Sequence, residues 1–267
     1  MILLSDQPTP GVLRLRLNRP EARNALNSEL RRDLAASFLE ADNDDAVRAV
    51  IIVGSPRSFA AGADLRELQN KSPAAMHRLG YDRLWRAIAD IRKPLIAAVN
   101  GYALGGGCEL ALHSDLIVAG RSAVFGLPEI KVGIMPGAGG TQRLVRAVGK
   151  YRALRMLMTG EQIAAPIASE WGLVSYLVED KAVEDTAIAL AAQIASGPSL
   201  AMEYIKEAVL SGADLPLQAA IAMERKSLQI LFDTHDQKEG MAAFLESRSP
   251  KFGPVNGTAD KSESGDE

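Results

Sequence analysis

Residues 93–110 read KPLIAAVNGYALGGGCEL, and this stretch decides the expected fold class and marks a candidate active site. The apolar run Leu95–Val99 predicts a buried strand, and a helix is expected to begin at Cys108. The three glycines between them let the backbone approach a ligand closely, and a helix start presents unpaired N–H groups to a negatively charged oxygen. Because Glu109 lies three residues after Gly106, this one segment offers a backbone donor beside a carboxylate.

The charge distribution argues against nucleic acid as the main partner. The chain has 267 residues, enough for one large domain or a domain with an appendage, and a formal net charge of −3. Residues 257–267 hold four acids and one lysine, so this segment accounts for the −3 and leaves the rest near neutral. Binding to a phosphate backbone needs a basic face, which a near-neutral body does not predict.

The cysteine and histidine content indicates whether disulfides or a metal site are expected and in which cellular compartment the protein works. A single cysteine, Cys108, allows no internal disulfide, which fits a reducing compartment, so a cytoplasmic location is predicted. Three histidines lack metal-ligand spacing, so no metal site is expected; they are His77, His113 and His235. The first ten residues lack the basic and apolar regions of a signal peptide, and no apolar run predicts a membrane span.

Strand and helix patterns alternate on both sides of the quoted stretch and predict an α/β fold. Val12–Leu17 alternates apolar and basic residues, as a strand with one solvated face does. A helix is expected from Ser28, with Ser28 itself as the N-cap. Val47–Val53 is a short β-branched run that predicts a buried strand. Asp115–Ala119 and Ala123–Phe125 predict further short strands.

The stretch Leu68–Ile91 is helical in composition, and its apolar residues allow two interpretations. The simpler one is a helix that packs on the sheet through its apolar face. The alternative is that part of the stretch, with Trp85 as the candidate residue, lines an apolar substrate pocket.

Helices dominate after the loop 133–140, and this change predicts a helical C-terminal region. The predicted helices are Thr141–Val148, Lys150–Met158, Ala182–Ala195, Leu200–Leu210, Leu217–Phe232 and Gln237–Glu246. We therefore expect a core with the active site over residues 1–197, a helical region over 198–253, and a disordered polar tail over 254–267.

The glycine-rich segments do not have the spacing of nucleotide-binding loops. Residues 105–107 lack the downstream glycine of a dinucleotide fingerprint, and the Gly149-Lys150 pair lacks the rest of a P-loop. A G-x-S-x-G nucleophile elbow is absent from the sequence. Cys108, beside three glycines, is more typical of a small buried hydrophobe than of a nucleophile.

Two further segments supply a second N–H donor and a second carboxylate. Residues 58–66 read SFAAGADLR, a small-residue loop after a buried strand, so the amide of Ala63 is a candidate donor into a shared cleft. A plain structural turn is the alternative for this loop. Residues 125–130 read FGLPEI and carry Glu129 after a short strand. The pattern alone favours a solvated or ion-paired Glu129 over a catalytic one.

Five segments together resemble the enoyl-CoA hydratase/isomerase, or crotonase, superfamily. They are NRPEARNALN (18–27), SFAAGADL (58–65), AAVNGYALGGGCELAL (97–112), FGLPEIKVGIMPGAGGTQRL (125–144) and GLVSYLV (172–178). The resemblance covers residues 10–253 and is greatest to hydratases with two active-site glutamates. It implies a crotonase-like spiral of ββα turns over residues 1–197, and a C-terminal helical region that builds trimers, often paired into hexamers.

The resemblance also implies catalytic roles for four of the candidate residues. The backbone N–H groups of Ala63 and Gly106 match the oxyanion hole that binds the thioester carbonyl in the family. Glu109 and Glu129 match the two glutamates that flank the alkene. The resemblance thus makes Glu129 a strong candidate, which its local pattern does not.

A further set of positions is implied to contact the CoA moiety: the backbone of Ala61, then Asp64, Leu65, Arg66 and Phe244. Phe244 matches an aromatic residue that reaches the adenine held by a neighbouring subunit. Some relatives have a lysine three residues after this aromatic, whereas this chain has Ser247. Arg248 or Arg66 is then expected to serve the CoA phosphates instead.

The implied activity is that of an enoyl-CoA hydratase, which adds water across the C2–C3 double bond of a 2-enoyl-CoA to give 3-hydroxyacyl-CoA. Such enzymes serve fatty-acid or aromatic-acid breakdown, including that of phenylacetate, and CoA is part of the substrate, so no cofactor is expected. The alternatives are an enoyl-CoA isomerase, another crotonase-fold CoA-thioester enzyme, and an RNA-binding hydratase-like protein. The acyl group stays open, from short straight or branched chains to dicarboxylic acyls such as dehydroadipyl.

Overall fold

The strand predicted from the quoted stretch lies in the middle of a six-stranded sheet with the strand order β1-β2-β3-β5-β7-β10. The computed structural model describes residues 1–253, except for the side chains of residues 82–84. The strands of this large sheet are β1 (Leu3–Thr9), β2 (Val12–Leu17), β3 (Ala49–Val53), β5 (Leu95–Val99), β7 (Leu116–Gly120) and β10 (Tyr176–Val178). All five residues of β5 are buried, as a central strand covered on both faces requires.

A second, smaller sheet has the order β4-β6-β8-β9. Its strands are β4 (Ser58–Ala60), β6 (Tyr102–Leu104), β8 (Val124–Gly126) and β9 (Gln162–Ala164). Three times in succession, a strand of the large sheet is followed directly by a strand of the small sheet: β3 by β4, β5 by β6, and β7 by β8. Parallel pairing joins β3 to β5 and β5 to β7 in one sheet, and β4 to β6 and β6 to β8 in the other.

Helices follow each of these turns and cover the sheets. The α-helices are α1 (Ser28–Asn43), α2 (Leu65–Leu68), α3 (Pro73–Arg78), α4 (Tyr81–Ala89), α5 (Gly106–Leu112), α6 (Gly140–Val148), α7 (Lys150–Thr159), α8 (Ala165–Glu170), α9 (Val183–Ala195), α10 (Ser199–Gly212), α11 (Leu217–Leu231) and α12 (His235–Leu245), and the 3₁₀ helices are η1 (Pro20–Ala22), η2 (Pro128–Val132) and η3 (Asp180–Ala182). The succession of strand, strand and helix confirms the predicted α/β spiral.

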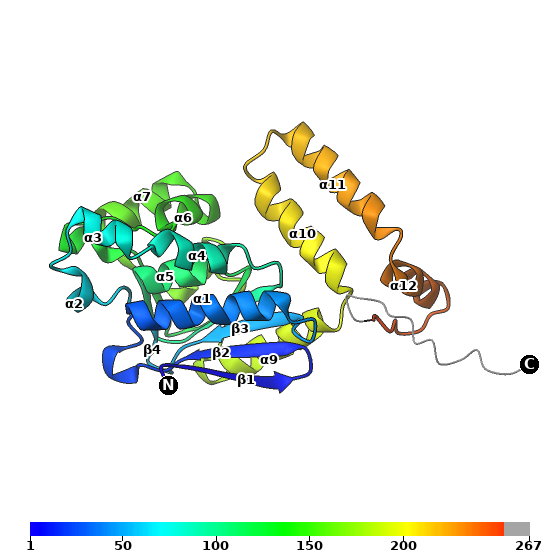
Figure 1. The fold of residues 1–267 in the computed structure, drawn as a ribbon, viewed down its shortest axis with the longest axis horizontal. Helices are drawn as coiled ribbons and strands as arrows, with labels where there is room; N and C mark the ends of the chain where they lie inside the picture. Colours follow the sequence, from blue (N-terminus) through cyan, green and yellow to red (C-terminus); the bar gives the residue numbers. More distant parts are fainter. Residues whose placement is uncertain (254–267) are drawn as a thin grey trace, which may run out of the picture.

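The alternation of side chains along the strands divides the core into two layers. Val50 and Ile52 of β3 point to one face of the large sheet, where α1, α4 and α5 cover it, and Ile51 points to the other face. On that second face α9 packs through Val183, Ala187, Ala191 and Ala195, a stripe of small residues at four-residue spacing. Figure 1 shows α1 and α9 on opposite sides of the sheet.

Two local predictions differ from the structure. The N-cap of α1 is Asn27, not Ser28, because the Asn27 side chain accepts a hydrogen bond from the Leu30 N–H at 2.9 Å. The stretch 68–91 is not one helix, because Pro73 begins a new helix and Gly80, with φ +62°, separates α3 from α4. The remaining predicted helices and strands are present, with ends shifted by a few residues.

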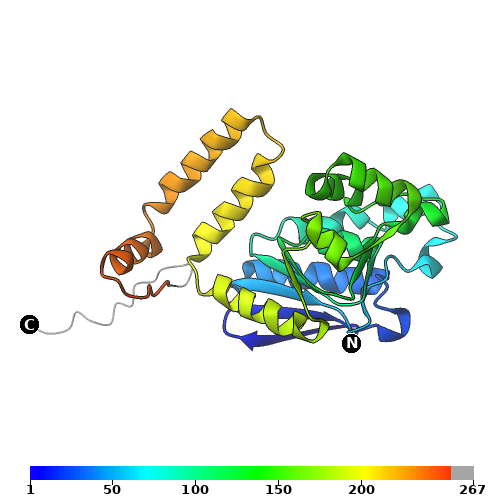
Figure 2. The same ribbon diagram turned by 180° about the vertical axis from the view of Figure 1, so that it is seen from behind.

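The last three helices stand apart from the two sheets. Figures 1 and 2 show α10, α11 and α12 extending to one side of the body, from opposite viewing directions. No residue of α10 or α11 is buried in this part of the described chain, and α12 buries Ala243 alone. Large apolar side chains are exposed along these helices, among them Ile205, Val209, Leu217, Leu228, Phe232 and Phe244.

The predicted disordered tail, 254–267, lies outside the described residues. Between residues 1 and 253, none of the helices combines the length and the apolar character that crossing a lipid bilayer requires.

Candidate active site

Glu109 lies on α5, whose first residue is Gly106, two residues earlier than predicted. The side chain is 4% exposed, and its Oε1 accepts hydrogen bonds from the backbone N–H of Ala138 at 2.7 Å and of Gly140 at 2.9 Å. Ala138 belongs to the glycine-rich loop before α6, and Gly140 is the first residue of α6. The loop and the start of α6 therefore hold one oxygen of a buried carboxylate in a fixed place.

The protonation of Glu109 depends on two opposing effects. Burial raises the pKa of the Glu109 carboxyl, because the charged form loses its hydration. The amides of Gly140 and Ala138, and the positive charge of Arg31, lower the pKa and so oppose this rise. Glu109 thus combines a buried position with donors that favour its ionised form, which is what a proton acceptor needs.

Glu129 lies on η2, a single 3₁₀ segment that begins with Pro128. A Cβ added at Gly105 would lie 3.0 Å from Glu129 Oε1, so the carboxyl reaches the glycine turn at which α5 begins. Its Oε2 is buried and has no hydrogen-bond partner within residues 1–253. Burial raises the pKa of Glu129 to about 7, and the charge of Glu109 adds to the rise. The two glutamates thus lie within electrostatic reach of each other.

The amides of Ala63 and Gly106 lie side by side. A Cβ added at Gly106 would lie 3.5 Å from the nitrogen of Ala63, and one added at Gly62 would lie 3.7 Å from the nitrogen of Gly106. In the parallel bridge between Leu26 and Ala63, the Leu26 N–H donates to Gly62 O at 2.7 Å. This pattern leaves the Ala63 N–H outside the ladder, and neither amide donates to a protein acceptor in the described chain. The pair can therefore bind one external oxygen atom.

Asn24 holds β4, the strand that leads into the Ala63 loop, and no local pattern in the sequence identified this residue. Its backbone is left-handed, with φ +57°, and its side chain is fully buried. Asn24 Nδ2 donates to the carbonyl oxygens of Ser58 at 3.0 Å and Phe59 at 3.2 Å, and Oδ1 accepts from the Arg19 N–H at 2.9 Å. The signal in the sequence was the Arg-Asn pair after Pro20, since asparagine tolerates left-handed backbone better than most residues.

The residues implied to contact CoA lie on two separate parts of the fold. Ala61 precedes the Ala63 amide, and its own N–H donates to Arg23 O at 3.0 Å. Asp64 caps α2 by accepting from the Arg66 N–H at 3.3 Å and forms an ion pair with Arg19, whereas Leu65 and Arg66 are exposed. Phe244 is 84% exposed on α12, in the helical region that stands apart. The α2 residues are thus close in sequence to Ala63, and Phe244 is not.

Trp85 lies in the core on α4, as the simpler interpretation of that stretch predicts. Its ring is 9% exposed and stacks on His113, with 5.3 Å between the ring centroids and 14° between the planes. Since His113 is on the same helix as Glu109, Trp85 supports the helix that carries the carboxylate. Its role as an acyl-pocket residue stays a prediction.

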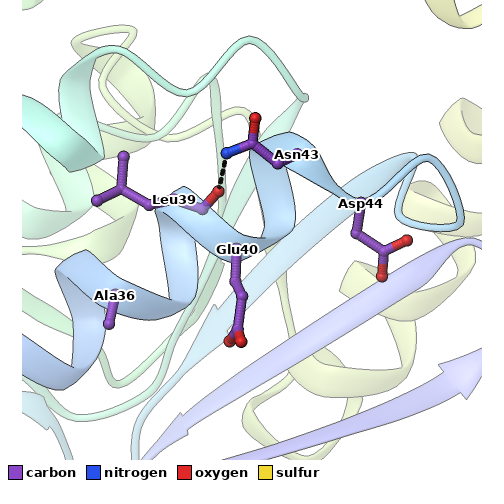
Figure 3. A pocket seen from close by; sticks show the side chains of 5 residues that line it. All are labelled: Ala36, Leu39, Glu40, Asn43 and Asp44. Atoms are coloured by element: carbon purple, nitrogen blue, oxygen red, sulfur yellow. Dashed lines mark hydrogen bonds between the residues drawn. The ribbon is translucent and has the colours of Figure 1, made fainter.

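The chain has hollows outside this region as well. Figure 3 shows one on the outer side of α1, with the side chains of Ala36, Leu39, Glu40, Asn43 and Asp44 around it. Asn43 Nδ2 donates to Leu39 O at 2.7 Å within the same helix. All five residues belong to α1 or its end, and no pair of facing acids or free amides converges there, so this hollow is not a candidate active site.

Comparison with known proteins agrees with this geometry. The family model described as enoyl-CoA hydratase/isomerase matches residues 8–254. The 2,3-dehydroadipyl-CoA hydratase of Escherichia coli K12 is 48% identical over 241 residues, which cover 90% of this chain and 94% of the relative. A probable enoyl-CoA hydratase of Rhizobium meliloti is 44% identical over 251 residues, 94% of this chain and 97% of the relative.

Solved structures agree as well. The enoyl-CoA hydratase subunit I of Geobacillus kaustophilus superposes with a TM-score of 0.92 at 42% identity, over 95% of this chain and 98% of that chain. The enoyl-CoA hydratase of Bacillus anthracis does so with a TM-score of 0.90 at 36% identity, over 94% and 99%. The sequence, the spiral and the paired carboxyls lead to one assignment: the chain belongs to the enoyl-CoA hydratase/isomerase family, the crotonase superfamily of enzymes.

Proposed function

We propose that this enzyme adds water across the C2–C3 double bond of 2-enoyl-CoA thioesters and releases 3-hydroxyacyl-CoA. One observation carries the proposal: two carboxyls within electrostatic reach of each other, Glu109 and Glu129, lie beside the paired free amides of Ala63 and Gly106. The named relatives, which are enoyl-CoA hydratases, support it.

In this proposal the amide pair stabilises the charge that develops on the thioester oxygen. Attack of water at C3 moves electrons onto the carbonyl oxygen as an enolate, and two fixed N–H donors offset that charge. Losing one such donor typically costs about 2.7–4 kcal/mol of barrier stabilisation. Because the donors are backbone groups, small residues such as Ala63 and Gly106 suffice there.

The two glutamates move the two protons. Glu109, whose ionised form is favoured by two amides, takes a proton from the water as its oxygen bonds to C3. Glu129, whose pKa of about 7 keeps a protonated fraction near neutrality, gives its proton to C2. Each such transfer is worth roughly 10²–10⁴-fold in rate. The water oxygen bonds to C3 and keeps one hydrogen, its other hydrogen passes to Glu109, and C2 receives the proton of Glu129. Before the next turnover Glu109 loses its proton to solvent and Glu129 takes one from solvent.

An isomerase is the second candidate, because a relative that shifts a double bond needs one carboxylate and no added water. The presence of two carboxyls with raised pKa values favours hydration. The test is to incubate the enzyme with crotonyl-CoA and follow the loss of the conjugated thioester absorbance, with identification of the product. Formation of 3-hydroxybutyryl-CoA supports the proposal, and formation of a shifted alkene from a longer ester without hydration contradicts it.

The acyl group belongs to the proposal as well. The E. coli relative is named for a dicarboxylic substrate, 2,3-dehydroadipyl-CoA, so this ester belongs in the substrate panel beside straight and branched enoyl-CoA esters. The ester with the highest kcat/KM identifies the class of acyl group that the enzyme prefers.

For the CoA phosphates we favour Arg66 over Arg248. Arg248 forms ion pairs with Glu239 and Glu246, and this pairing lowers the pKa of Glu239 to about 2. Arg66 is exposed on α2 and forms no ion pair with the side chains that the structure describes. A rise in KM for the Arg66→Ala variant, with none for Arg248→Ala, supports this choice.

Self-association as a trimer, or as a pair of trimers, is proposed for α10–α12. Contiguous exposed apolar surface marks interaction sites, and these helices expose Val209, Leu217 and Phe244. Light scattering of the purified protein measures the assembly, and a monomer at micromolar concentration contradicts the proposal.

A further inference from the structure

The backbone of Ala138 is held on both sides by one helix. Its N–H donates to Glu109 Oε1 at 2.7 Å, and its carbonyl oxygen lies 2.9 Å from His113 Nε2. Glu109 and His113 are four residues apart on α5 and its end, so their side chains share a face of the helix. The amide that orients the carboxylate is thus joined, through the Ala138 Cα, to a carbonyl that the C-cap residue of the same helix holds.

The loop needs this hydrogen bond because glycines on both sides of Ala138 allow its backbone many conformations. Ala138 lies between Gly137 and Gly139, and Gly139 has φ +96°. A Cβ added at Gly137 would meet no atom within 4 Å, so the side-chain position there is open. Glycine backbone has more conformational freedom than any other, so the direction of the Ala138 N–H must be fixed from outside the loop.

His113 has the chemistry for this task. A carbonyl oxygen only accepts hydrogen bonds, so Nε2 carries the hydrogen and Nδ1 carries none. Nδ1 is buried without a partner in the described chain, and burial together with the nearby charge of Arg143 lowers the pKa of His113 to about 4. The ring is neutral at physiological pH and keeps one donor. Stacking on Trp85 fixes the plane of the ring.

We infer that His113 is a positioning residue for the hydration reaction: by holding the Ala138 carbonyl it restricts rotation about the Ala138 Cα, so that the Ala138 N–H stays aimed at Glu109. The inference rests on the proposed hydratase function and on the two hydrogen bonds of Ala138. A histidine that only fills the core would contribute to stability and leave the chemistry of Glu109 unchanged, so the two roles make different predictions.

The test compares two variants of the full-length enzyme. His113→Leu removes the donor at similar volume, and His113→Gln keeps an amide N–H that reaches the Ala138 carbonyl. We expect His113→Leu to lower kcat for crotonyl-CoA about 10–100-fold, with KM within about twofold, since a small misplacement of a catalytic group costs up to about 10²-fold. His113→Gln should recover most of the lost rate.

The pH profile gives a readout that a merely structural role would not change. With the Ala138 amide released, Glu109 loses a donor that lowers its pKa, so the acidic limb of kcat against pH should move to higher pH in His113→Leu and return in His113→Gln. The other charged groups that face this pair are Arg31 on α1, Glu129 on η2 and Arg143 on α6. They are unchanged in both variants, so the shift reports the Ala138 contact.

Two outcomes separate failure of this inference from failure of the proposed function. A wild-type enzyme that hydrates no enoyl-CoA ester overturns the function, and the pKa of Glu109, followed by carbon-13 NMR of its carboxyl in the two variants, then still tests His113. A folded His113→Leu enzyme with wild-type kcat and an unshifted profile overturns the inference. If His113→Leu does not fold, equal profiles for His113→Gln and His113→Ala overturn it instead.

Discussion

The two segments that carry the glutamates differ in how the backbone treats the carboxyl group. Glu109 lies on the regular helix α5 and accepts two amide hydrogen bonds, whereas Glu129 lies on the short segment η2 and leaves Oε2 without a partner in the described chain. Burial raises the pKa of both carboxyls; amides of a distant segment oppose the rise for Glu109, whereas for Glu129 only its own backbone amide does. Identical side chains are thus suited to opposite tasks because of the donors around them.

The largest effect on turnover is expected when either carboxyl, that of Glu109 or that of Glu129, is removed. Glu109→Gln and Glu129→Gln should each lower kcat for crotonyl-CoA by at least about 100-fold, because each removes one proton transfer worth roughly 10²–10⁴-fold. The rates are measured from the loss of thioester absorbance, and circular dichroism serves as the control for folding. A near-normal rate in either variant would remove that glutamate from the mechanism.

A smaller effect is expected from crowding Glu129 through the glycine turn. In Gly105→Ala the new Cβ would lie 3.0 Å from Glu129 Oε1, at a residue with φ +49°, so the carboxyl must move. We expect kcat to fall about 10–100-fold, as for other small misplacements.

Gly172→Ala is the matched control for this substitution. Gly172 also has positive φ, +84°, and a Cβ there would meet no atom within 4 Å. Both variants should lose stability from backbone strain, but only Gly105→Ala should lose turnover. Equal losses of turnover in the two would show that strain, and not contact with Glu129, is responsible.

The pH dependence of turnover in the wild-type enzyme should show that Glu129 acts in its protonated form and Glu109 in its ionised form. Since the proton donor must be protonated, kcat should decline above the pKa of Glu129, about 7, and approach a tenfold loss per further pH unit. On the acidic side, turnover should decline as Glu109 is protonated, at a pH above the ordinary glutamate range. Because the two carboxyls interact, the two apparent pKa values of this profile describe the pair together and not one residue each. A rate that stays constant from pH 6 to roughly pH 9 would contradict the assignment.

The smallest effect concerns stability. The pKa of Glu129 is about 7 in the folded protein and near 4.5 when unfolded, so the folded state binds more protons and the free energy of unfolding falls as pH rises from about 4.5 through about 7. Glu129→Gln should remove this decline and add on the order of 1 kcal/mol at pH 8, less than the whole pKa shift implies because the carboxyl is partly solvated. Urea unfolding at several pH values measures it.

His113 supplies a control of opposite sign for that measurement. Its pKa is about 4 when folded and 6.5 when unfolded, so the unfolded state binds more protons and stability rises with pH between these values. His113→Gln should remove this rise and leave the decline due to Glu129. If both variants change the pH dependence in the same direction, the pKa shifts given above are wrong.

Most of the long, periodic elements of the fold were predictable, and most of the short ones were not. Strand Leu95–Val99 and the helices α6, α7 and α9 to α12 were expected, because runs of five apolar residues or ten helical ones carry a readable period. Three strands of the small sheet were missed, since β4, β6 and β9 have three residues each and Tyr102–Leu104 looks like a polar turn; β8 was expected as Ala123–Phe125. Three residues carry no period, and these strands exist because distant strands pair with them.

The local sequence identified some residues of the candidate site and not others. The glycines before α5 and the carboxylate after them identified Gly106 and Glu109 directly, because glycine and helix starts have local physical causes. Glu129 became a strong candidate only through the family resemblance, since an isolated glutamate on a short turn has no local feature that separates it from a solvated one. Asn24 and His113 were not singled out for their supporting contacts, which join residues 25 to 35 positions apart.

The sequence by itself determined the α/β class, the order of the main elements, and the residue types available for acid, base and amide donors, because periodicity and backbone preference act over a few residues. Only the tertiary structure decided which carboxyl receives amide hydrogen bonds from a distant segment, which one keeps an oxygen without a partner in the described chain, and that Glu109 and His113 hold the N–H and the carbonyl of Ala138. Those differences arise from burial and from contacts between distant segments, and the free energy of a charge depends on what surrounds it in space and not along the chain.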